Sequence, residues 1–253
     1  NSITIFKHAI RVTDKKHPTF AIAYNNLGIV LFAKQKNEEA ISHYKMALEL
    51  NPDSAVAHNN LGIALFTKQK NEEAISHYKM AIKINPDHAE AHYNLGNVLF
   101  AKQKNEEAIS HYKMAIKIKP DYALAHNNLG NALLNKGRTG EAISHYKMAI
   151  KLNSDYALAY NNLGNALSAE RKIEEAITHY KMAIELRPGY SEAHHNLGNV
   201  LFNAKMTEEA IDYYKEAIRI RPNFALAHNN LGNALVQKGE MKEAIDHYRE
   251  TLK

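Results

Sequence analysis

The dipeptide Leu27-Gly28 recurs at a fixed interval along this chain of 253 residues. Further copies follow every 34 residues, as Leu61-Gly62, Leu95-Gly96, Leu129-Gly130, Leu163-Gly164, Leu197-Gly198 and Leu231-Gly232. A constant period of this length is typical of proteins built from stacked copies of one small unit. We therefore expect function to lie on a surface that the copies present together.

Each repeat carries the pattern of two amphipathic helices. When Leu27 is counted as position 7, small residues recur at positions 3, 8 and 20, and large apolar residues recur at positions 7, 11, 21 and 24. The spacings 3-7-11 and 20-24-27 place side chains on one helical face, which predicts two helices that face each other. The repeats are predicted to span residues 21–54, 55–88, 89–122, 123–156, 157–190, 191–224 and 225–253.

Turn residues separate the predicted helices. Proline at position 32 is expected to end the second helix, because proline cannot continue a helix. Asparagine after the preceding polar turn is expected to cap the start of that helix. The prolines are Pro52, Pro86, Pro120, Pro188 and Pro222, with Ser154 in the remaining place, and the predicted caps are Asn37, Asn71 and Asn105.

Composition argues against several classes of function. The net charge of +5 comes from interleaved basic and acidic residues, whereas nucleic-acid binding requires basic residues gathered on one face. The absence of cysteine excludes disulfides and thiolate metal sites and leaves the compartment open. No apolar run approaches the roughly 18 residues of a membrane span, and the first residues do not resemble a signal peptide. We expect a soluble fragment that contacts neither nucleic acid nor membrane.

The 15 histidines suggest a metal site, but their spacing argues against one. Most lie in two columns, at position 4 (His58, His92, His126, His194 and His228) and at position 23 (His43, His77, His111, His145, His179 and His247). Neighbours in one column belong to helices about 10 Å apart, too far for one ion that needs ligands at about 2 Å. No catalytic relay and no glycine-rich phosphate loop is evident. We therefore expect no metal, no cofactor and no catalytic residue.

The combination of Leu-Gly at positions 7 and 8, alanine at 20 and 27, tyrosine at 24 and proline at 32 resembles the tetratricopeptide repeat family. The resemblance covers residues 21–253. It implies an all-α, right-handed superhelical solenoid of antiparallel helix pairs, in which the first helices line a concave groove. It also implies a non-catalytic scaffold that holds proteins or peptides. Position 4 departs from the large aromatic of the family, because it is histidine in five repeats.

Asparagine dominates the positions that this resemblance places in the groove. Position 6 is Asn26, Asn60, Asn94, Asn128, Asn162, Asn196 and Asn230; position 9 adds Asn97, Asn131, Asn165, Asn199 and Asn233; position 5 adds Asn25, Asn59, Asn127, Asn161 and Asn229. An amide offers an acceptor and two donors, which match the C=O and N–H of a peptide backbone. The position-6 column resembles the asparagine ladder in the repeat domain of the O-linked N-acetylglucosamine transferase. Positions 6 and 9 are therefore predicted to bind an extended polypeptide.

A structural role for the asparagines stays open beside this prediction. The position-6 amides would then bond to a neighbouring helix or turn and hold the angle between repeats, and both roles can coexist. A clamp for acidic C-termini is disfavoured, because such clamps use lysine or arginine at positions 2, 5 and 6, and this chain has neither residue there.

The two ends of the chain give further expectations. Residues 1–20 are predicted to form half a repeat, a second helix followed by a loop. Residues 1–13 resemble the segment that precedes the repeat tail of bacterial membrane glycosyltransferase-like proteins. This resemblance implies an alternative function, in which the chain is the substrate-presenting soluble tail of a membrane-embedded glycosyltransferase. No polar capping helix follows Leu252-Lys253, so end-to-end self-association is also expected.

Overall fold

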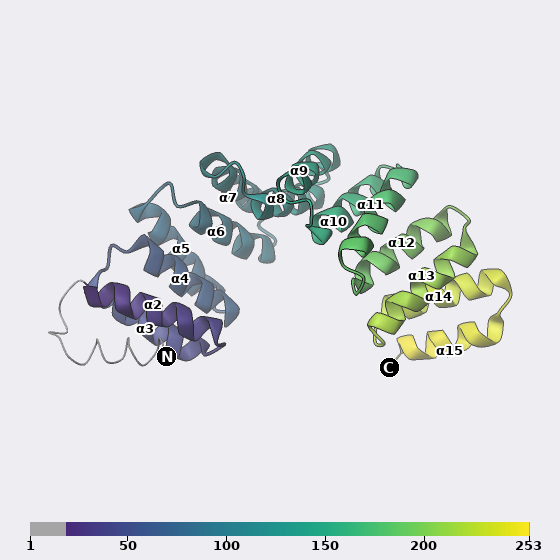
Figure 1. Ribbon diagram of the computed structural model, residues 1–253, viewed down its shortest axis with the longest axis horizontal. Coiled ribbons are helices and arrows are strands. Elements are labelled where there is room, and N and C mark those ends of the chain that lie inside the picture. Colours follow the sequence, from purple (N-terminus) through teal and green to yellow (C-terminus); the bar gives the residue numbers. More distant parts are fainter. Residues whose placement is uncertain (1–18, 253) are drawn as a thin grey trace. The chain divides into compact units, whose positions relative to one another are not determined.

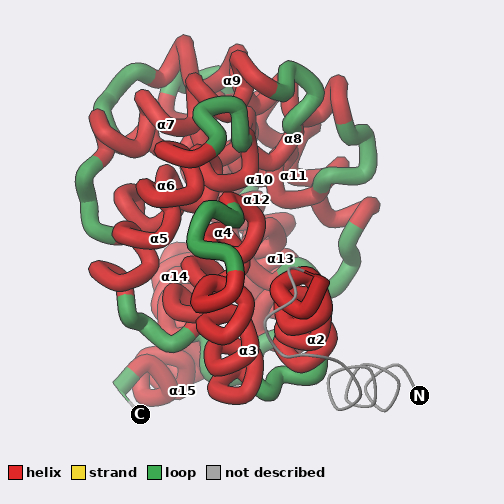
Figure 2. The backbone as a smooth tube through the Cα atoms, turned by 90° about the vertical axis from the view of Figure 1, so that its left-hand side faces the viewer, coloured by secondary structure: helices red, strands yellow, loops and turns green. Residues whose placement is uncertain are grey.

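The computed structural model describes residues 19–252 of the chain. Within this range every regular element is an α-helix and no strand occurs (Figure 1 and Figure 2). The predicted half-repeat helix and the glycosyltransferase-like segment, residues 1–13, lie outside the described residues. Among the helices that the structure describes, none is long and apolar enough to cross a membrane.

First and second helices alternate along the described range. The first helices are α2 (Thr19–Ala33), α4 (Ala55–Thr67), α6 (Ala89–Ala101), α8 (Ala123–Asn135), α10 (Ala157–Ala169), α12 (Ser191–Asn203) and α14 (Ala225–Lys238). The second helices are α3 (Asn37–Leu50), α5 (Asn71–Ile84), α7 (Asn105–Ile118), α9 (Thr139–Leu152), α11 (Ile173–Leu186), α13 (Thr207–Ile220) and α15 (Met241–Thr251).

The helices pack as consecutive pairs inside two compact blocks, an N-terminal block up to residue 125 and a C-terminal block from residue 126. In the N-terminal block, α2 packs on α3, α4 on α5 and α6 on α7. In the C-terminal block, α10 packs on α11, α12 on α13 and α14 on α15. Each pair also contacts the first helix that follows it within its block, as α3 contacts α4 and α13 contacts α14. This confirms the predicted all-α fold of adjacent helix pairs.

A tight turn joins the two helices of each pair and requires one residue in the left-handed region of backbone space. This residue, at position 15, has φ between 59° and 91° in every repeat. It is glycine only at Gly137 and Gly239, and the remaining repeats hold Gln35, Gln69, Gln103, Arg171 and Lys205. A non-glycine residue in this region costs about 1 kcal/mol, so the turn is strained in those repeats.

The predicted asparagine caps are wrong, because the turn places the asparagine inside the helix. Asn37 is the first helical residue of α3, and the cap position belongs to Lys36, whose side chain makes no capping bond. Asn71 and Asn105 occupy the same place in α5 and α7. Backbone groups close the turn instead, since the N–H of Lys36 donates to the carbonyl of Leu31 at 3.0 Å.

The core of each pair forms around a tyrosine ring that lies against a glycine. The tyrosine is position 24 of the second helix, and the glycine is position 8 of the first. A Cβ atom added to this glycine would lie 2.5–2.7 Å from the tyrosine Cε1 in every repeat, so only glycine leaves room for the ring. The alanine at position 20 is at most 1% exposed in every repeat and completes the contact.

The substitution Gly130→Ala tests this contact. The added Cβ would meet the Tyr146 ring at 2.5 Å, so the ring or the helix has to move. We expect a loss of about 1–3 kcal/mol in the free energy of unfolding, measured by urea denaturation followed by circular dichroism.

Gly140→Ala is the matched control, because a Cβ there would meet no atom within 4 Å. It should change stability by no more than about 1 kcal/mol, since only helix propensity is altered. Equal losses in the two variants would contradict the proposed role of the tyrosine–glycine contact.

Candidate functional site

Five position-6 asparagines connect their first helix to the first helix of the preceding repeat. In the N-terminal block, the Nδ2 of Asn60 donates to the Oδ1 of Asn25 at 3.0 Å. The equivalent bonds run from Asn94 to Asn59 at 3.0 Å, from Asn162 to Asn127 at 3.0 Å, from Asn196 to Asn161 at 3.1 Å and from Asn230 to His195 Nε2 at 3.0 Å. The bond to a neighbouring helix that the structural interpretation predicted is therefore present for these five asparagines.

The bond to the preceding helix uses only one of the hydrogen-bonding groups of a position-6 amide, although further bonds occupy the rest of the Asn230 amide. All seven position-6 side chains, including those of Asn26 and Asn128, are only partly buried. An amide that turns one N–H toward the preceding helix keeps its second N–H and its oxygen for another partner. Neighbouring side chains use the oxygen in two cases, since Asn127 donates to Asn128 at 3.0 Å and Asn229 donates to Asn230 at 3.3 Å.

Position 5 faces the interior in the middle repeats, contrary to the expectation that it lines the groove. Asn59, Asn127 and Asn161 are 6%, 0% and 4% exposed, and each accepts the bond from a position-6 amide. A buried amide needs a partner, and the following repeat supplies it. Position 5 therefore serves the contact between repeats.

The position-9 asparagines have their orientation set by the core tyrosines. The Oδ1 atoms of Asn97, Asn131, Asn165, Asn199 and Asn233 accept hydrogen bonds at 2.7–2.8 Å from the hydroxyls of Tyr112, Tyr146, Tyr180, Tyr214 and Tyr248. Burial raises the pKa of Tyr146, Tyr180 and Tyr214, so these hydroxyls stay protonated donors. Because the oxygen is held toward the core, the NH₂ group of each amide faces away from it.

A recess between α12, α13 and α14 shows how these amides combine. It is lined by Asn199, Phe202, Asn203, Tyr214, Asn230 and Asn233. The Oδ1 of Asn199 accepts both the Tyr214 hydroxyl and the Nδ2 of Asn230, each at 2.8 Å. With its oxygen doubly occupied, this amide offers N–H donors to any partner in the recess.

Apolar side chains accompany the amides on the first helices. Position 2 carries Ile22, Val56, Leu124, Leu158 and Leu226, which are 40–64% exposed. Phenylalanine at position 12 is half-buried at Phe32, Phe66, Phe100 and Phe202. The first helices thus combine oriented amides with exposed apolar surface.

The structure brings the two histidine columns together, which the sequence analysis missed by treating each column alone. Position 4 of the first helix and position 23 of the second helix meet within one repeat. The Nδ1 atoms lie 2.9 Å apart in His58–His77, 3.1 Å in His92–His111, 3.0 Å in His126–His145 and 3.0 Å in His228–His247. The sequence contains a signal for this contact, because positions 4 and 23 are both histidine in the same four repeats.

Hydrogen bonds fix the tautomers in the pairs. The Nε2 of His58 lies 3.1 Å from the carbonyl oxygen of Pro52, so this nitrogen carries a proton and donates it. In the neutral ring the Nδ1 of His58 is then the acceptor, and the Nδ1 of His77 donates to it. The carbonyls of Pro86 and Pro222 hold the equivalent histidines of two other pairs.

The other repeats replace one histidine by tyrosine and lose this bond. Their ring pairs are Tyr24–His43, Tyr160–His179 and His194–Tyr213. The Nδ1 atoms of His179 and His194 are buried without a hydrogen-bond partner. In each histidine pair, the Nδ1 atom of one ring is therefore the hydrogen-bond partner of the Nδ1 atom of the other ring.

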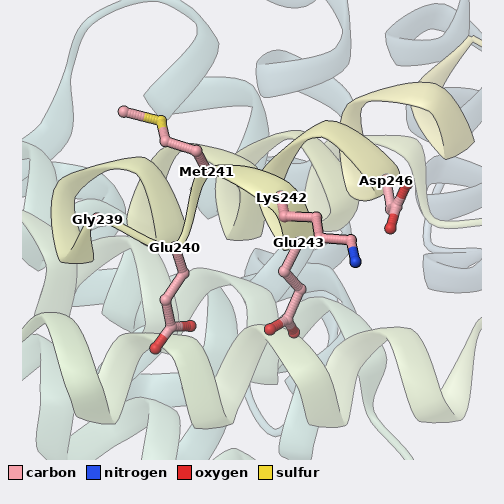
Figure 3. Close-up of a pocket in the computed structure, with 6 residues that line it drawn as sticks. All are labelled: Gly239, Glu240, Met241, Lys242, Glu243 and Asp246. Atoms are coloured by element: carbon pink, nitrogen blue, oxygen red, sulfur yellow. The ribbon is translucent and has the colours of Figure 1, made fainter.

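A depression at the start of α15 lies apart from these features (Figure 3). Its lining is Gly239, Glu240, Met241, Lys242, Glu243 and Asp246. Glu240 and Glu243 point to one side of the helix, and Met241 points to the other. Lysines already pair with the two carboxylates, Lys238 with Glu240 at 2.9 Å and Lys215 with Glu243 at 3.4 Å. Both glutamates of this depression are therefore already paired.

Within residues 19–252, no group of three or more histidine or acidic side chains is placed to hold a metal ion. The largest fully buried side chains in this range are the core tyrosines and leucines. The chemistry that the described surface offers is hydrogen bonding by amides and imidazoles.

The repeat pattern matches known families along most of the chain. Family models described as TPR repeat match residues 29–69, 64–102, 96–137 and 130–170, and models described as tetratricopeptide repeat match residues 155–223 and 195–253. These matches begin at residue 29, so none of them supports the glycosyltransferase-like resemblance of residues 1–13. None of the curated proteins compared with the chain matches it.

Solved structures agree with this assignment. YrrB, a TPR protein with an unusual peptide-binding site, is 26% identical with a TM-score of 0.60, over 73% of this chain and 95% of YrrB. MamA is 29% identical with a TM-score of 0.57, over 62% of this chain and 92% of MamA. The APC/C hetero-tetramer Cut9-Hcn1 contains a chain 22% identical with a TM-score of 0.79, over 92% of this chain and 45% of that one, which supports the fold.

The histidine pairs predict a loss of stability in mild acid. Burial lowers the pKa of His58, His77, His92, His111 and His247 from the ordinary value of 6.5. The unfolded chain then binds more protons than the folded chain below pH 6.5, so stability is full above this pH and falls as pH decreases. We expect the melting temperature to fall between pH 7 and pH 5, a range above most carboxylate titration.

The control variant carries tyrosine at position 4, a residue that occurs naturally there in two repeats. Tyrosine replaces the position-4 histidine at Tyr24 and Tyr160, so the variant His58→Tyr, His92→Tyr, His126→Tyr, His228→Tyr removes one histidine from each pair. Its melting temperature should fall less over the same pH range. An unchanged fall would show that other groups cause the acid sensitivity.

Proposed function

This chain belongs to the tetratricopeptide repeat family, and we propose that it is a non-catalytic scaffold whose first helices hold an extended polypeptide through asparagine amides. The family and the likeness to YrrB, which is described as having a peptide-binding site, support a protein or peptide partner. The observation that carries the finer proposal is the fixed orientation of the position-9 amides.

The position-9 amides form a row of donors. Each oxygen is occupied by a tyrosine hydroxyl, so the row presents N–H groups along the first helices. A peptide backbone supplies one carbonyl acceptor per residue whatever its side chains are. The row therefore suits a partner recognised by its backbone, with the apolar position-2 residues adding contact area.

The position-6 amides add acceptors beside these donors. In Asn162 the Nδ2 atom is turned to the preceding helix, which leaves the oxygen of the same amide for a backbone N–H. Packed helices lie about 10 Å apart, and an extended strand rises about 3.3 Å per residue. One repeat then corresponds to about three residues of the partner.

The variant Asn165→Asp, Asn199→Asp tests the donor row. A carboxylate still accepts the hydroxyls of Tyr180 and Tyr214, so the core keeps its bonds while the outward N–H groups are lost. The probe is the tightest 20-residue peptide selected on the unmodified chain from a random library. We expect its dissociation constant, measured by fluorescence anisotropy, to rise at least tenfold, because two hydrogen bonds of about 1 kcal/mol are lost and the new charge repels carbonyl oxygens.

The control separates the lost donors from the added charge. Ser144→Asp, Thr178→Asp adds the same charge at position 22 of the second helices, where Asp212 and Asp246 already occur in later repeats. This variant should bind the peptide as the unmodified chain does. Unchanged binding by Asn165→Asp, Asn199→Asp, or equal weakening in the control, would contradict the proposal.

Alanine at position 6 would be a poorer test. Asn162→Ala removes the donor to Asn127, which is fully buried, and an unsatisfied buried acceptor costs about 1–3 kcal/mol. Lost binding would then be mixed with lost stability. The aspartate variants at position 9 avoid this difficulty.

Two further predictions concern partners beyond a peptide. The glycosyltransferase alternative rests on residues 1–13 and is tested by reading the gene upstream of Asn1, where transmembrane helices are required. End-to-end self-association would use α15 and the residue that follows it, because Met241, Ile245 and Leu252 are 50–87% exposed. Sedimentation of the chain tests this second prediction directly.

A further inference from the structure

We propose that each of the four histidine pairs is a two-histidine site for a divalent transition-metal ion that prefers right-angled coordination, Cu²⁺ or Ni²⁺. The pairs are His58–His77, His92–His111, His126–His145 and His228–His247. Each pair joins the first and second helix of one repeat. This site is separate from the asparagine rows and does not rest on the proposed peptide binding.

The distance between the two Nδ1 atoms carries the proposal. It is 2.9–3.1 Å in all four pairs. Two imidazole nitrogens bound about 2.1 Å from an ion and at right angles lie about 3.0 Å apart, whereas a tetrahedral angle separates them by about 3.4 Å. Square-planar and tetragonal nitrogen sites are typical of Cu²⁺ and Ni²⁺.

In three of the pairs, the position-4 ring makes the second hydrogen bond that is common for histidine ligands of metal ions. A histidine ligand usually donates its other ring N–H to a carbonyl or carboxylate, which fixes the ring. The Nε2 atoms of His58, His92 and His228 donate to the carbonyls of position-32 prolines at 2.9–3.1 Å. The Nδ1 atom of each of these rings therefore carries the lone pair, which accepts the partner ring's N–H when no ion is bound.

The second ring becomes a ligand by moving one proton. In His77 the proton leaves Nδ1 and a proton joins Nε2 through water, so the ring stays neutral and its Nδ1 lone pair turns to the ion. A histidine binds a metal ion as the neutral ring, which is the main form of an ordinary imidazole at pH 7. No net proton is released in this exchange.

The charged side chains named around three of the pairs are net negative. In His58–His77 the neighbours are Lys45, Glu73 and Asp53, and Glu49 lines the same depression. In His92–His111 they are His88, Asp87, Lys79 and Glu107, and in His228–His247 they are Lys215, Glu243 and Asp246. With two protein ligands per ion, water fills the remaining coordination positions.

The first experiment is calorimetric titration of the full chain with CuCl₂ or NiCl₂ at pH 7 in a buffer that does not bind metals. We expect four equivalent ions per chain and a rise in melting temperature, because an ion that binds the folded chain alone stabilises it. Mg²⁺, which prefers oxygen ligands, should have no effect. Binding with no stabilisation, or no saturable binding, would overturn the proposal.

Two variants assign the ions to the pairs. His58→Tyr, His92→Tyr, His126→Tyr, His228→Tyr removes the position-4 member, and His77→Tyr, His111→Tyr, His145→Tyr, His247→Tyr removes the position-23 member, as Tyr213 does naturally. Each should keep its helicity and bind at least tenfold more weakly, without the four-ion step. If one variant fails to fold, the other gives the same test.

The control removes histidines outside the pairs. His88→Ser, His195→Asn uses the residues found at the same positions in other repeats, Ser54 and Asn25. It should keep four ions and the unmodified affinity. If this control loses ions while the paired variants keep them, the binding belongs to scattered histidines and the proposal is wrong.

Discussion

The structure depends on the contact between the position-24 tyrosine and the position-8 glycine. The ring fills the space that a Cβ atom would occupy, so the two helices of a pair approach closely at this point. The hydroxyl of the same tyrosine donates to the oxygen of the position-9 amide in five repeats. One side chain thus sets both the packing of a repeat and the chemistry of its outer face.

Internal hydrogen bonds divide the asparagines by function. Position 5 is buried and accepts in three repeats, position 6 donates to the preceding repeat in five, and position 9 accepts from the core in five. The hydrogen bond that each amide already makes determines whether its N–H groups or its oxygen remain for a partner. The residues that look alike in the sequence therefore present different groups, with outward N–H donors at position 9 and oxygens at several position-6 residues.

The sequence predicted the fold well because its signals are local and repeated. Helix pairs follow from the spacing of Leu27, Gly28 and Tyr44, and α9 ends at Leu152 although Ser154 replaces proline there. The prediction of asparagine caps was wrong because Gln35 adopts a left-handed backbone conformation, which is not a preference of glutamine. The histidine pairs and the burial of position 5 depend on contacts between helices, which the helical periodicity does not contain.

The bonds between repeats have a consequence for how the chain unfolds. The amide of Asn196 satisfies Asn161 in the preceding repeat, 35 residues earlier, and Asn161 is 4% exposed. When one repeat opens, its neighbour keeps a buried amide without a donor, which favours opening of the neighbour as well. Arrays that interact only through nearest neighbours gain cooperativity from such interfacial terms. The asparagine contacts therefore couple adjacent repeats, so that each block tends to melt as a whole.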